Sequence, residues 1–310
     1  MSFAAVSASL LPAASRARGV ASRCGGGPTP CWRRASRHVW WLEAATGEPD
    51  PINGGVTTQL VAVRDGSRIW LVGSGPTPDQ GRALAASVER MLGGAVTDLI
   101  ATRAAPQLAL GNVAFPAARR WALPETIAAM RERCETCSTR LRAELGAAGA
   151  GLRPELIRVP DRAIGARGAT HGRLGPFAWL ALERSPGEPV LVLRHEADHV
   201  VIAQGLLWAG AVPDLRETRS DAMLASLHRL AAWAGASRLL GEQGGEGGRH
   251  DVAQHVRYIE ALRTATAAAL QRGDLEPVEL PAWRDGAGYP LRHGVNAQRV
   301  WRELEPALFR

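Results

Sequence analysis

The segment His195-Glu196-Ala197-Asp198-His199 has the residue types that most directly suggest metal chemistry. In the pattern His-Glu-x-x-His, two histidines one helical turn apart bind a metal ion and the glutamate acts as a base. Here the segment joins two runs of β-forming residues and is too short for a helix. Because a hairpin turn would splay these side chains and no third ligand lies at a suitable spacing, we expect no metal ion here.

The elements around this segment alternate between strands and helices. Asp65 and Gly66 predict a hairpin turn between two β-rich runs, and apolar residues at helical spacing after Pro78 predict an amphipathic helix. The expected strands are residues 56–64, 67–72, 97–101, 156–159, 177–182, 190–193, 200–203 and 238–240. The expected helices are residues 78–92, 125–145, 221–234, 251–271 and 296–304. A hairpin, a helix and a strand, repeated in that order, fit two β-rich halves with helices outside.

Residues 100–112 carry the most specific resemblance to a known family. After an apolar strand they have the frame Thr-x-x-x-Pro-x-x-x-Leu-Gly-Asn, which resembles the main metal-binding loop of the metallo-β-lactamase fold. In that family the loop carries His-x-His-x-Asp-His. The same slots hold Arg103, Ala105, Gln107 and Leu108. None of these side chains is an imidazole, thiolate or carboxylate of the kind that zinc needs.

Four further frames resemble the same family, and each lacks its metal-site residue. Gly73 lies where an acidic residue normally supports the metal loop, and Arg184 replaces a ligand histidine. Gly205 stands in the slot of the aspartate that bridges two metal ions, and Gln243 stands in the slot of the last histidine. The resemblance implies the scaffold of a dizinc hydrolase, whereas the replaced residues imply that no such centre forms and that no cofactor is bound.

The resemblance covers residues 38–305 and is nearest to the branch of quinoprotein relay system zinc metallohydrolases. The features nearest to that branch are Asn53-Gly54-Gly55, the expected helix with Arg133-Cys134-x-x-Cys137, and the tail 292–305. It implies an α+β protein with a four-layer αββα sandwich over residues 39–305, including a helical tail at 249–305. It also implies a periplasmic location and a protein partner in an oxidoreductase system.

Six of the seven positive charges in the net charge of +7 lie in the N-terminal segment, residues 1–38. Six arginines precede the first acidic residue, Glu43, and without them the chain has 31 basic and 30 acidic residues. Nucleic-acid binding is therefore not expected, and no apolar run is long enough for a membrane span. The apolar run 3–14 lacks the preceding positive charge of a secretory signal, so we expect either a disordered extension or a degenerate export leader.

The four cysteines form two local pairs, Cys24 with Cys31 and Cys134 with Cys137. A redox-active Cys-x-x-Cys motif usually begins a helix that follows a strand, where the helix N-terminus lowers the thiol pKa. Cys134 and Cys137 lie instead in the middle of an expected helix. Both pairs remain open between disulfides and plain thiols.

Arg103 and Arg184 indicate what a site without its metal ligands could bind. A guanidinium group cannot ligate a metal ion, but it supplies positive charge and pairs with carboxylate or phosphate. We hypothesise that both groups converge on the former metal site and bind an anion or neutralise acidic groups; the alternative is that both point outward. Three function classes remain: a non-catalytic binding or accessory component of an oxidoreductase relay, which the replaced ligands favour, an active metal-dependent hydrolase with other ligands, and an enzyme with metal-free chemistry.

Overall fold

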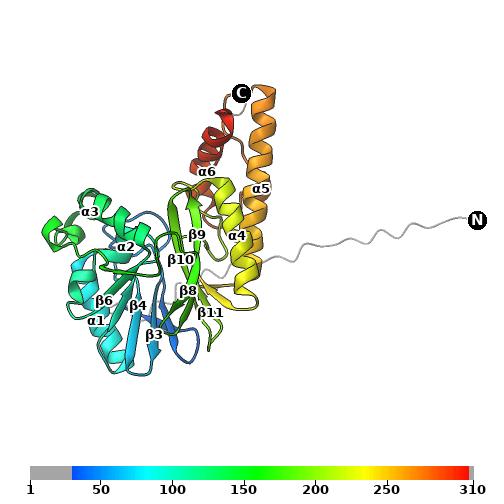
Figure 1. Cartoon of the computed structure of the whole chain (residues 1–310). Coiled ribbons are helices and arrows are strands. Elements are labelled where there is room, and N and C mark those ends of the chain that lie inside the picture. Colours follow the sequence, from blue (N-terminus) through cyan, green and yellow to red (C-terminus); the bar gives the residue numbers. More distant parts are fainter. Residues whose placement is uncertain (1–29, 307–310) are drawn as a thin grey trace, which may run out of the picture.

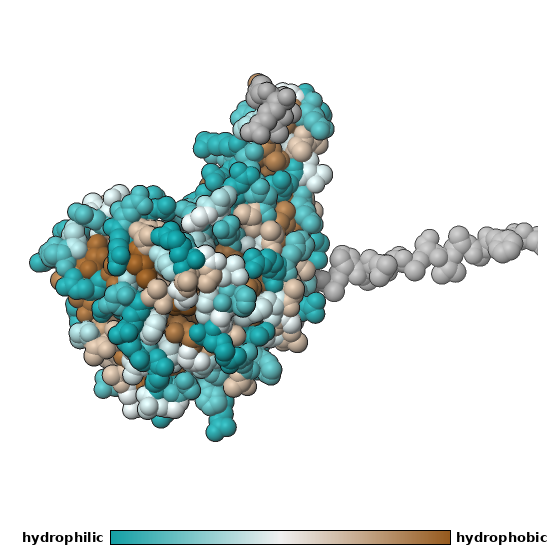
Figure 2. Space-filling view, in the orientation of Figure 1, coloured by the Kyte–Doolittle hydropathy of each residue, from teal (hydrophilic) through white to brown (hydrophobic). Residues whose placement is uncertain are grey.

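The computed structural model describes residues 30–306, which form two β-sheets packed face to face with helices on both outer faces (Figure 1). The predicted α+β, four-layer αββα sandwich is confirmed. The surface seen from the same side is largely hydrophilic, and apolar residues form only scattered patches on it (Figure 2). None of the helices within residues 30–306 is long and apolar enough to cross a membrane.

The first sheet has seven strands in sequence order. They are β1 (Trp32–Arg34), β2 (Val39–Leu42), β3 (Leu60–Asp65), β4 (Arg68–Val72), β5 (Asp98–Ile100), β6 (Arg119–Ala122) and β7 (Arg162–Ala163). β1 to β4 pair antiparallel, and the pairs from β4 to β7 are parallel. The predicted hairpin at Gly66 joins β3 to β4 with Asp65 opposite Arg68.

The second sheet has six strands in the order β13-β12-β11-β10-β9-β8. They are β8 (His171–Leu174), β9 (Phe177–Ser185), β10 (Glu188–His195), β11 (Val200–Ile202), β12 (Arg238–Leu240) and β13 (Glu246–Gly247). β9 and β10 form a long antiparallel hairpin, and β11 continues from β10 through the turn 196–199. β12 returns parallel to β11.

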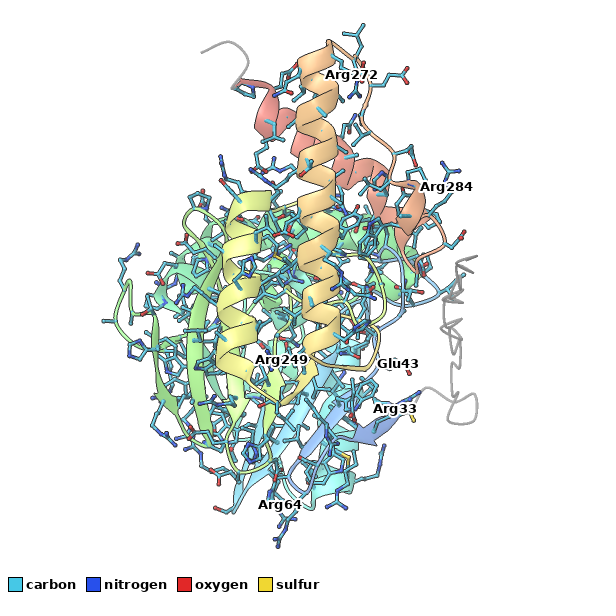
Figure 3. The ribbon with its side chains drawn as sticks, turned by 90° about the vertical axis from the view of Figure 1, so that its right-hand side faces the viewer. Arg33, Glu43, Arg64, Arg249, Arg272 and Arg284 are labelled. Carbon is cyan, nitrogen blue, oxygen red and sulfur yellow. The ribbon has the colours of Figure 1, made fainter. Side chains whose placement is uncertain are left out.

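Helices cover both sheets. The helices are α1 (Pro78–Leu92), α2 (Pro106–Ala109), α3 (Pro124–Leu145), α4 (Ser220–Ala234), α5 (Arg249–Arg272) and α6 (Tyr289–Leu304). Thr77 caps α1 by accepting a hydrogen bond from the Gln80 amide, and Gly93 ends it in the left-handed conformation. α4, α5 and α6 lie together on the side of the second sheet, where α5 extends from Arg249 to beyond the sandwich at Arg272 (Figure 3).

Three apolar layers hold these four layers of structure together. One lies between the first sheet and its helices and includes Leu71, Val88 and Met130. The middle layer lies between the sheets, and the third packs the second sheet against α4, α5 and α6. Side chains along each strand point alternately to its two faces, and each face contacts a different apolar layer. Both faces are therefore buried, which explains the nearly continuous apolar runs in β3, β4, β10 and β11.

Several elements differ from the expectation. Residues 156–159 form no strand: a short 3₁₀ turn at Pro154–Leu156 is followed by irregular chain. β6 is a strand that the sequence does not predict, because two of its residues are arginines. It forms a strand through its pairing with β5 and not through the β-propensity of its own residues. α6 begins at Tyr289 rather than near residue 296.

The N-terminal boundary of the fold lies before residue 39. β1 pairs with β2, with Trp32 opposite Leu42, so the end of the expected leader is part of the first sheet. Ala35, in the turn between β1 and β2, is buried. Residues 1–29, which make up the rest of the expected leader, lie outside the described residues.

Candidate functional site

The carboxyl ends of β5 and β11 meet at one edge of the sandwich. The Leu191 amide donates to the Thr102 carbonyl at 2.8 Å, and the Thr102 hydroxyl donates to Gln204 Oε1 at 2.7 Å. These bonds join the two sheets just before the loops that follow β5 and β11. Arg103 and Gly205, which lie far apart in the sequence, are neighbours as a result.

Arg103 forms an ion pair with Glu242 at this edge. Arg103 Nη2 lies 2.6 Å from Glu242 Oε1, and only 15% and 7% of the two side chains are exposed. The Thr58 hydroxyl donates to the same carboxylate oxygen, and the Gly205 amide donates to Oε2 at 2.8 Å. Both oxygens of Glu242 are therefore engaged by groups of the protein itself.

Gly205 gives Arg103 the space that it occupies. A Cβ atom at Gly205 would lie 2.9 Å from both Cδ and Nε of Arg103, closer than carbon atoms approach in proteins. Gly205 also has φ +78°, which side chains other than glycine adopt only with strain. The side chain at 103 and the absence of one at 205 are thus sterically coupled.

Gly73 and Leu108 are coupled in the same way. A Cβ atom at Gly73 would lie 2.8 Å from Leu108 Cδ2 and 2.6 Å from Leu60 Cδ2. Leu108 is 1% exposed and belongs to the apolar layer beneath α1. Ala105 is buried at the start of α2, and Gln107 is half-buried. Because neither side chain ionises, neither adds a charge to the edge.

Gln243 connects the edge to the C-terminal helix. Its Nε2 donates to the Thr57 carbonyl at 2.9 Å, while its Oε1 accepts a hydrogen bond from Arg292 of α6. Arg292 also donates to the Val212 carbonyl at 2.7 Å. Burial lowers the pKa of Arg292, which packs over the ring of Trp208.

The side chain of Arg184, in β9, makes no hydrogen bond or ion pair within residues 30–306, whereas its backbone carbonyl accepts a hydrogen bond from the Arg219 amide at 2.8 Å. Arg184 Nε is buried without a partner. Burial lowers the pKa of Arg184, and the nearby charge of Arg103 lowers it further. The residue is only half-buried, and the nearby carboxylates of Glu242, Glu217 and Asp214 oppose the lowering of its pKa. Its guanidinium group still lacks a direct carboxylate partner, so this side chain is suited to receive an anion.

We define the edge site as Arg103, Arg184, Gly205, Glu242 and Gln243, with Arg292 behind it. Sequence reasoning singled out four of the five and missed Glu242, although it is adjacent to Gln243 in the chain. In the sequence, Arg292 is distinguished only as part of the tail 292–305. The signal that was available for Glu242 is its position just after the apolar strand β12, where a buried carboxylate needs a partner.

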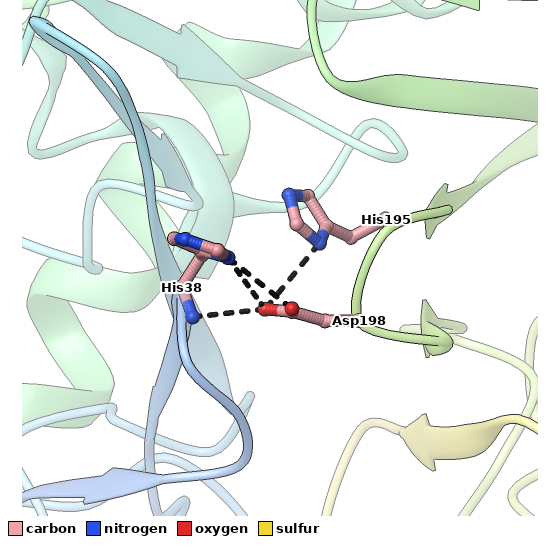
Figure 4. A group of neighbouring side chains, drawn as sticks. All are labelled: His38, His195 and Asp198. Atoms are coloured by element: carbon pink, nitrogen blue, oxygen red, sulfur yellow. Dashed lines mark hydrogen bonds and ion pairs between the residues drawn. The ribbon is translucent and has the colours of Figure 1, made fainter.

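The segment 195–199 holds a second group of polar residues. The turn closes with the His199 amide donating to the Glu196 carbonyl, and His199 has φ +51°. This turn places Asp198 Oδ2 3.6 Å from His195 Nδ1, and His38 joins them from the β1–β2 turn (Figure 4). The expectation that no third ligand accompanies this segment is therefore wrong, because His38 is distant in sequence and adjacent in space.

The cysteines of α3 are free thiols. Cys134 is buried and Cys137 is half-buried. Burial raises the pKa of Cys134 to about 11, so this thiol is almost fully protonated at neutral pH. Cys31 takes part in a disulfide, and Cys24 lies outside the described residues.

Solved structures of metallo-β-lactamases share this arrangement of sheets and helices. The metallo-β-lactamase from Hirschia baltica is 13% identical, with a TM-score of 0.59, and the match covers 74% of this chain and 97% of that one. FIM-1 from Pseudomonas aeruginosa, in its mono-zinc form, is 11% identical with a TM-score of 0.60, covering 75% and 96%. The metallo-β-lactamase from Erythrobacter litoralis is 14% identical with a TM-score of 0.59, covering 76% and 98%. This chain has the metallo-β-lactamase fold.

No protein-family model matches the chain, and neither does any curated protein. Zinc, which the metallo-β-lactamase fold implies, does not fit the edge site. Its one carboxylate, on Glu242, is already bound by Arg103, Thr58 and the Gly205 amide, and the neighbouring groups are guanidinium and amide. Zinc sites need about three imidazole, thiolate or carboxylate ligands. Within residues 30–306 such a group of three occurs at His38, His195 and Asp198 instead.

Proposed function

We propose that this chain is a metallo-β-lactamase-fold protein whose metal centre has been replaced by an ion pair, and that it acts by binding rather than by zinc-dependent hydrolysis. The replaced positions are those at which the sequence resembles the family without its ligands: Gly73, Arg103, Ala105, Gln107, Leu108, Arg184, Gly205 and Gln243. The sequence frames support this assignment of positions, and the packing at the edge site supports the loss of the metal.

The contact between Arg103 and Gly205 is the observation that carries the proposal. A metal ion near Glu242 would need the carboxylate that Arg103, Thr58 and the Gly205 amide now hold. An acidic side chain at 205 would overlap Arg103. Restoring a metal centre would therefore require several coupled changes rather than one.

The ligand that the edge site suits is a small anion. Arg103 is neutralised by Glu242, whereas the guanidinium group of Arg184 has no carboxylate partner in the described part of the chain. Arg292 adds a third guanidinium group, bound only to neutral oxygen atoms. Guanidinium groups pair with the oxygens of carboxylates and phosphates, so we assign this ligand chemistry to the edge site.

Calorimetric titration with inorganic phosphate and with succinate tests the anion site. We expect binding of at least one of the two, and we expect Arg184→Gln to weaken it by about tenfold or more, since a charge-assisted hydrogen bond is lost. Arg64→Gln is the matched control, because Arg64 is an exposed arginine on the hairpin between β3 and β4 (Figure 3). Failure of both anions to bind, or equal affinity in Arg184→Gln, contradicts the anion site.

We further propose an accessory role in a periplasmic oxidoreductase relay, based on the resemblance of the sequence to the quinoprotein relay branch. The tail that carries this resemblance contains Arg292, whose bond to Gln243 ties α6 to the edge site. A pulldown with the tagged chain tests the role. Capture of a quinone-linked dehydrogenase supports it, and capture that is equally strong with an unrelated metallo-β-lactamase-fold protein contradicts it.

A metal-dependent hydrolase with other ligands is the competing function. The buried carboxylate of Glu242 favours it, because carboxylates are zinc ligands. This alternative predicts that zinc displaces Arg103 and that Glu242→Gln abolishes hydrolysis and metal binding together. The proposed ion pair predicts neither result.

A further inference from the structure

The geometry points to a second, separate site: His38, His195 and Asp198 form a binding site for a divalent transition-metal ion, with zinc as the best-suited ion. We call these three residues the His38 cluster. It lies at the turn between β10 and β11, whereas the edge site lies near the start of β10. Val190, beside Gly205, is five residues from His195 along β10, which places the two sites about 17 Å apart.

The donor atoms of the His38 cluster are close to the spacing that zinc requires. One ligand atom from each residue lies within 4.8 Å of the other two. Asp198 Oδ1 is 3.2 Å from His38 Nδ1, and Asp198 Oδ2 is 3.6 Å from His195 Nδ1. Donors around a tetrahedral zinc ion with bonds of about 2.0 Å are about 3.3 Å apart, so small side-chain rotations suffice to bring the three into position.

Asp198 is held in place by groups outside the cluster. The Ser36 hydroxyl donates to Asp198 Oδ2 at 2.6 Å, and the His38 backbone amide donates to the same oxygen at 2.8 Å. Such bonds orient a ligating carboxylate before the metal ion arrives. They also connect the β1–β2 turn of the first sheet to the β10–β11 turn of the second.

His195 supplies an independent indication of a ligand. It is 4% exposed, and its Nδ1 has no hydrogen-bond partner, although it is directed at Asp198 (Figure 4). Buried polar atoms are rarely left without a partner in folded proteins. A metal ion between His195, His38 and Asp198 would satisfy this nitrogen.

The residue types select the class of ion. Two imidazoles and one carboxylate suit zinc, and a fourth position remains for water. The His38 side chain is 37% exposed, so an ion can enter from solvent at that side. Because the ligands come from both sheets, the ion would act as a cross-link between them, and its binding would stabilise the folded state.

Titration of the metal-free chain with zinc, followed by calorimetry and by the thermal midpoint, tests this inference. We expect one ion per chain and a higher midpoint with zinc. His38→Ala, at a partly exposed position, should weaken binding by at least about tenfold, and so should His195→Gln. His171→Ala is the matched control, because His171 is an exposed histidine in β8 of the same sheet.

Two further measurements keep the outcomes distinct. Cobalt in place of zinc should give the intense visible absorption of a tetrahedral site, and His38→Ala should remove it. Glu242→Gln should leave zinc binding unchanged, since the edge site is not involved. Absence of binding, binding that survives both His38→Ala and His195→Gln, or loss of binding in His171→Ala would overturn the inference.

Discussion

The side chain of Arg103 fills the volume that a side chain at residue 205 would need. A Cβ atom built on Gly205 meets Arg103 Cδ and Nε at 2.9 Å, and the Gly205 amide donates to the carboxylate that Arg103 also binds. The two positions are linked by packing and by a shared partner, Glu242. A change at one of them therefore alters the stability effect of a change at the other.

Gly205→Ala should destabilise the fold more than an alanine at another glycine of the same backbone conformation. Gly187→Ala is the matched control, since Gly187 has φ +76° but open space around its Cβ position. Backbone strain alone costs about 1 kcal/mol, and overlap with a packed side chain adds about 1–3 kcal/mol. Urea unfolding of both variants measures the difference.

The same substitution in an Arg103→Ala background should lose the overlap with Arg103 and keep the backbone strain and a tight contact with Val190 Cγ2 at 3.3 Å. The cost of Gly205→Ala should then fall toward that of Gly187→Ala. Equal costs of Gly205→Ala with and without Arg103 would show that Arg103 does not lie against residue 205.

Removal of Arg103 should leave Glu242 as a buried carboxylate without its ion-pair partner. We expect Arg103→Met to cost about 3 kcal/mol in the free energy of unfolding at neutral pH, because breaking a buried pair strands a charge. Glu242→Gln in the same background should recover part of that loss. A double-mutant cycle measures the coupling energy, and a value indistinguishable from zero would mean that the pair is not formed in solution.

The edge site and the His38 cluster differ in how much of them the sequence could predict. Hairpins and helix ends follow local rules, so the turn at Gly66 and the start of α1 at Pro78 agree with expectation. Arg103, Gly205 and Gln243 can be predicted because each lies in the loop just after a strand, in a recognisable frame. His38 could not be found, because it reaches His195 and Asp198 only through the packing of two sheets.

Glu242 illustrates a different limit. Its importance depends on Arg103, Thr58 and the Gly205 amide, which come from three separate segments. Residue type alone gives an acidic residue after a strand, and most such residues are exposed. Arg103, the partner that allows Glu242 to be buried, is brought next to it only by the folding of the chain.

The stability of the fold should fall in mild acid partly through His255. This residue of α5 is buried and accepts a hydrogen bond from the Trp208 amide at 3.0 Å, and burial lowers its pKa to about 3. Above pH 6.5 the residue is neutral in both states and contributes no pH dependence. Between about pH 6.5 and pH 3 only the unfolded state binds the proton, so stability falls by up to about 1.4 kcal/mol per pH unit.

His255→Gln retains an acceptor for the Trp208 amide and does not titrate. Its free energy of unfolding, measured from pH 7 to pH 4, should fall less steeply than that of the unsubstituted chain. The difference in slope should approach about 1.4 kcal/mol per pH unit, which is the contribution of one proton. Identical slopes for the two chains would mean that His255 takes up its proton in the folded state.

Cys134 should react slowly with thiol reagents. Because burial raises its pKa to about 11, its thiolate fraction at pH 8 is roughly 100-fold below that of an ordinary cysteine. Mass spectrometry of iodoacetamide-labelled peptides can follow this site in the folded chain and in urea. Labelling at equal rates in both conditions would contradict the burial of Cys134 and would revive a redox role for the Cys134–Cys137 pair.

Anomalous diffraction at the zinc absorption edge, from crystals grown with zinc, shows whether a metal ion or the Arg103–Glu242 ion pair occupies the edge site. We expect no anomalous peak within about 3 Å of Glu242, and we expect Arg103 Nη2 in contact with Glu242 Oε1. A peak at the His38 cluster bears only on the second site. A zinc ion bound to Glu242, with Arg103 displaced from Gly205, would contradict the claim that an ion pair has taken the place of the metal centre.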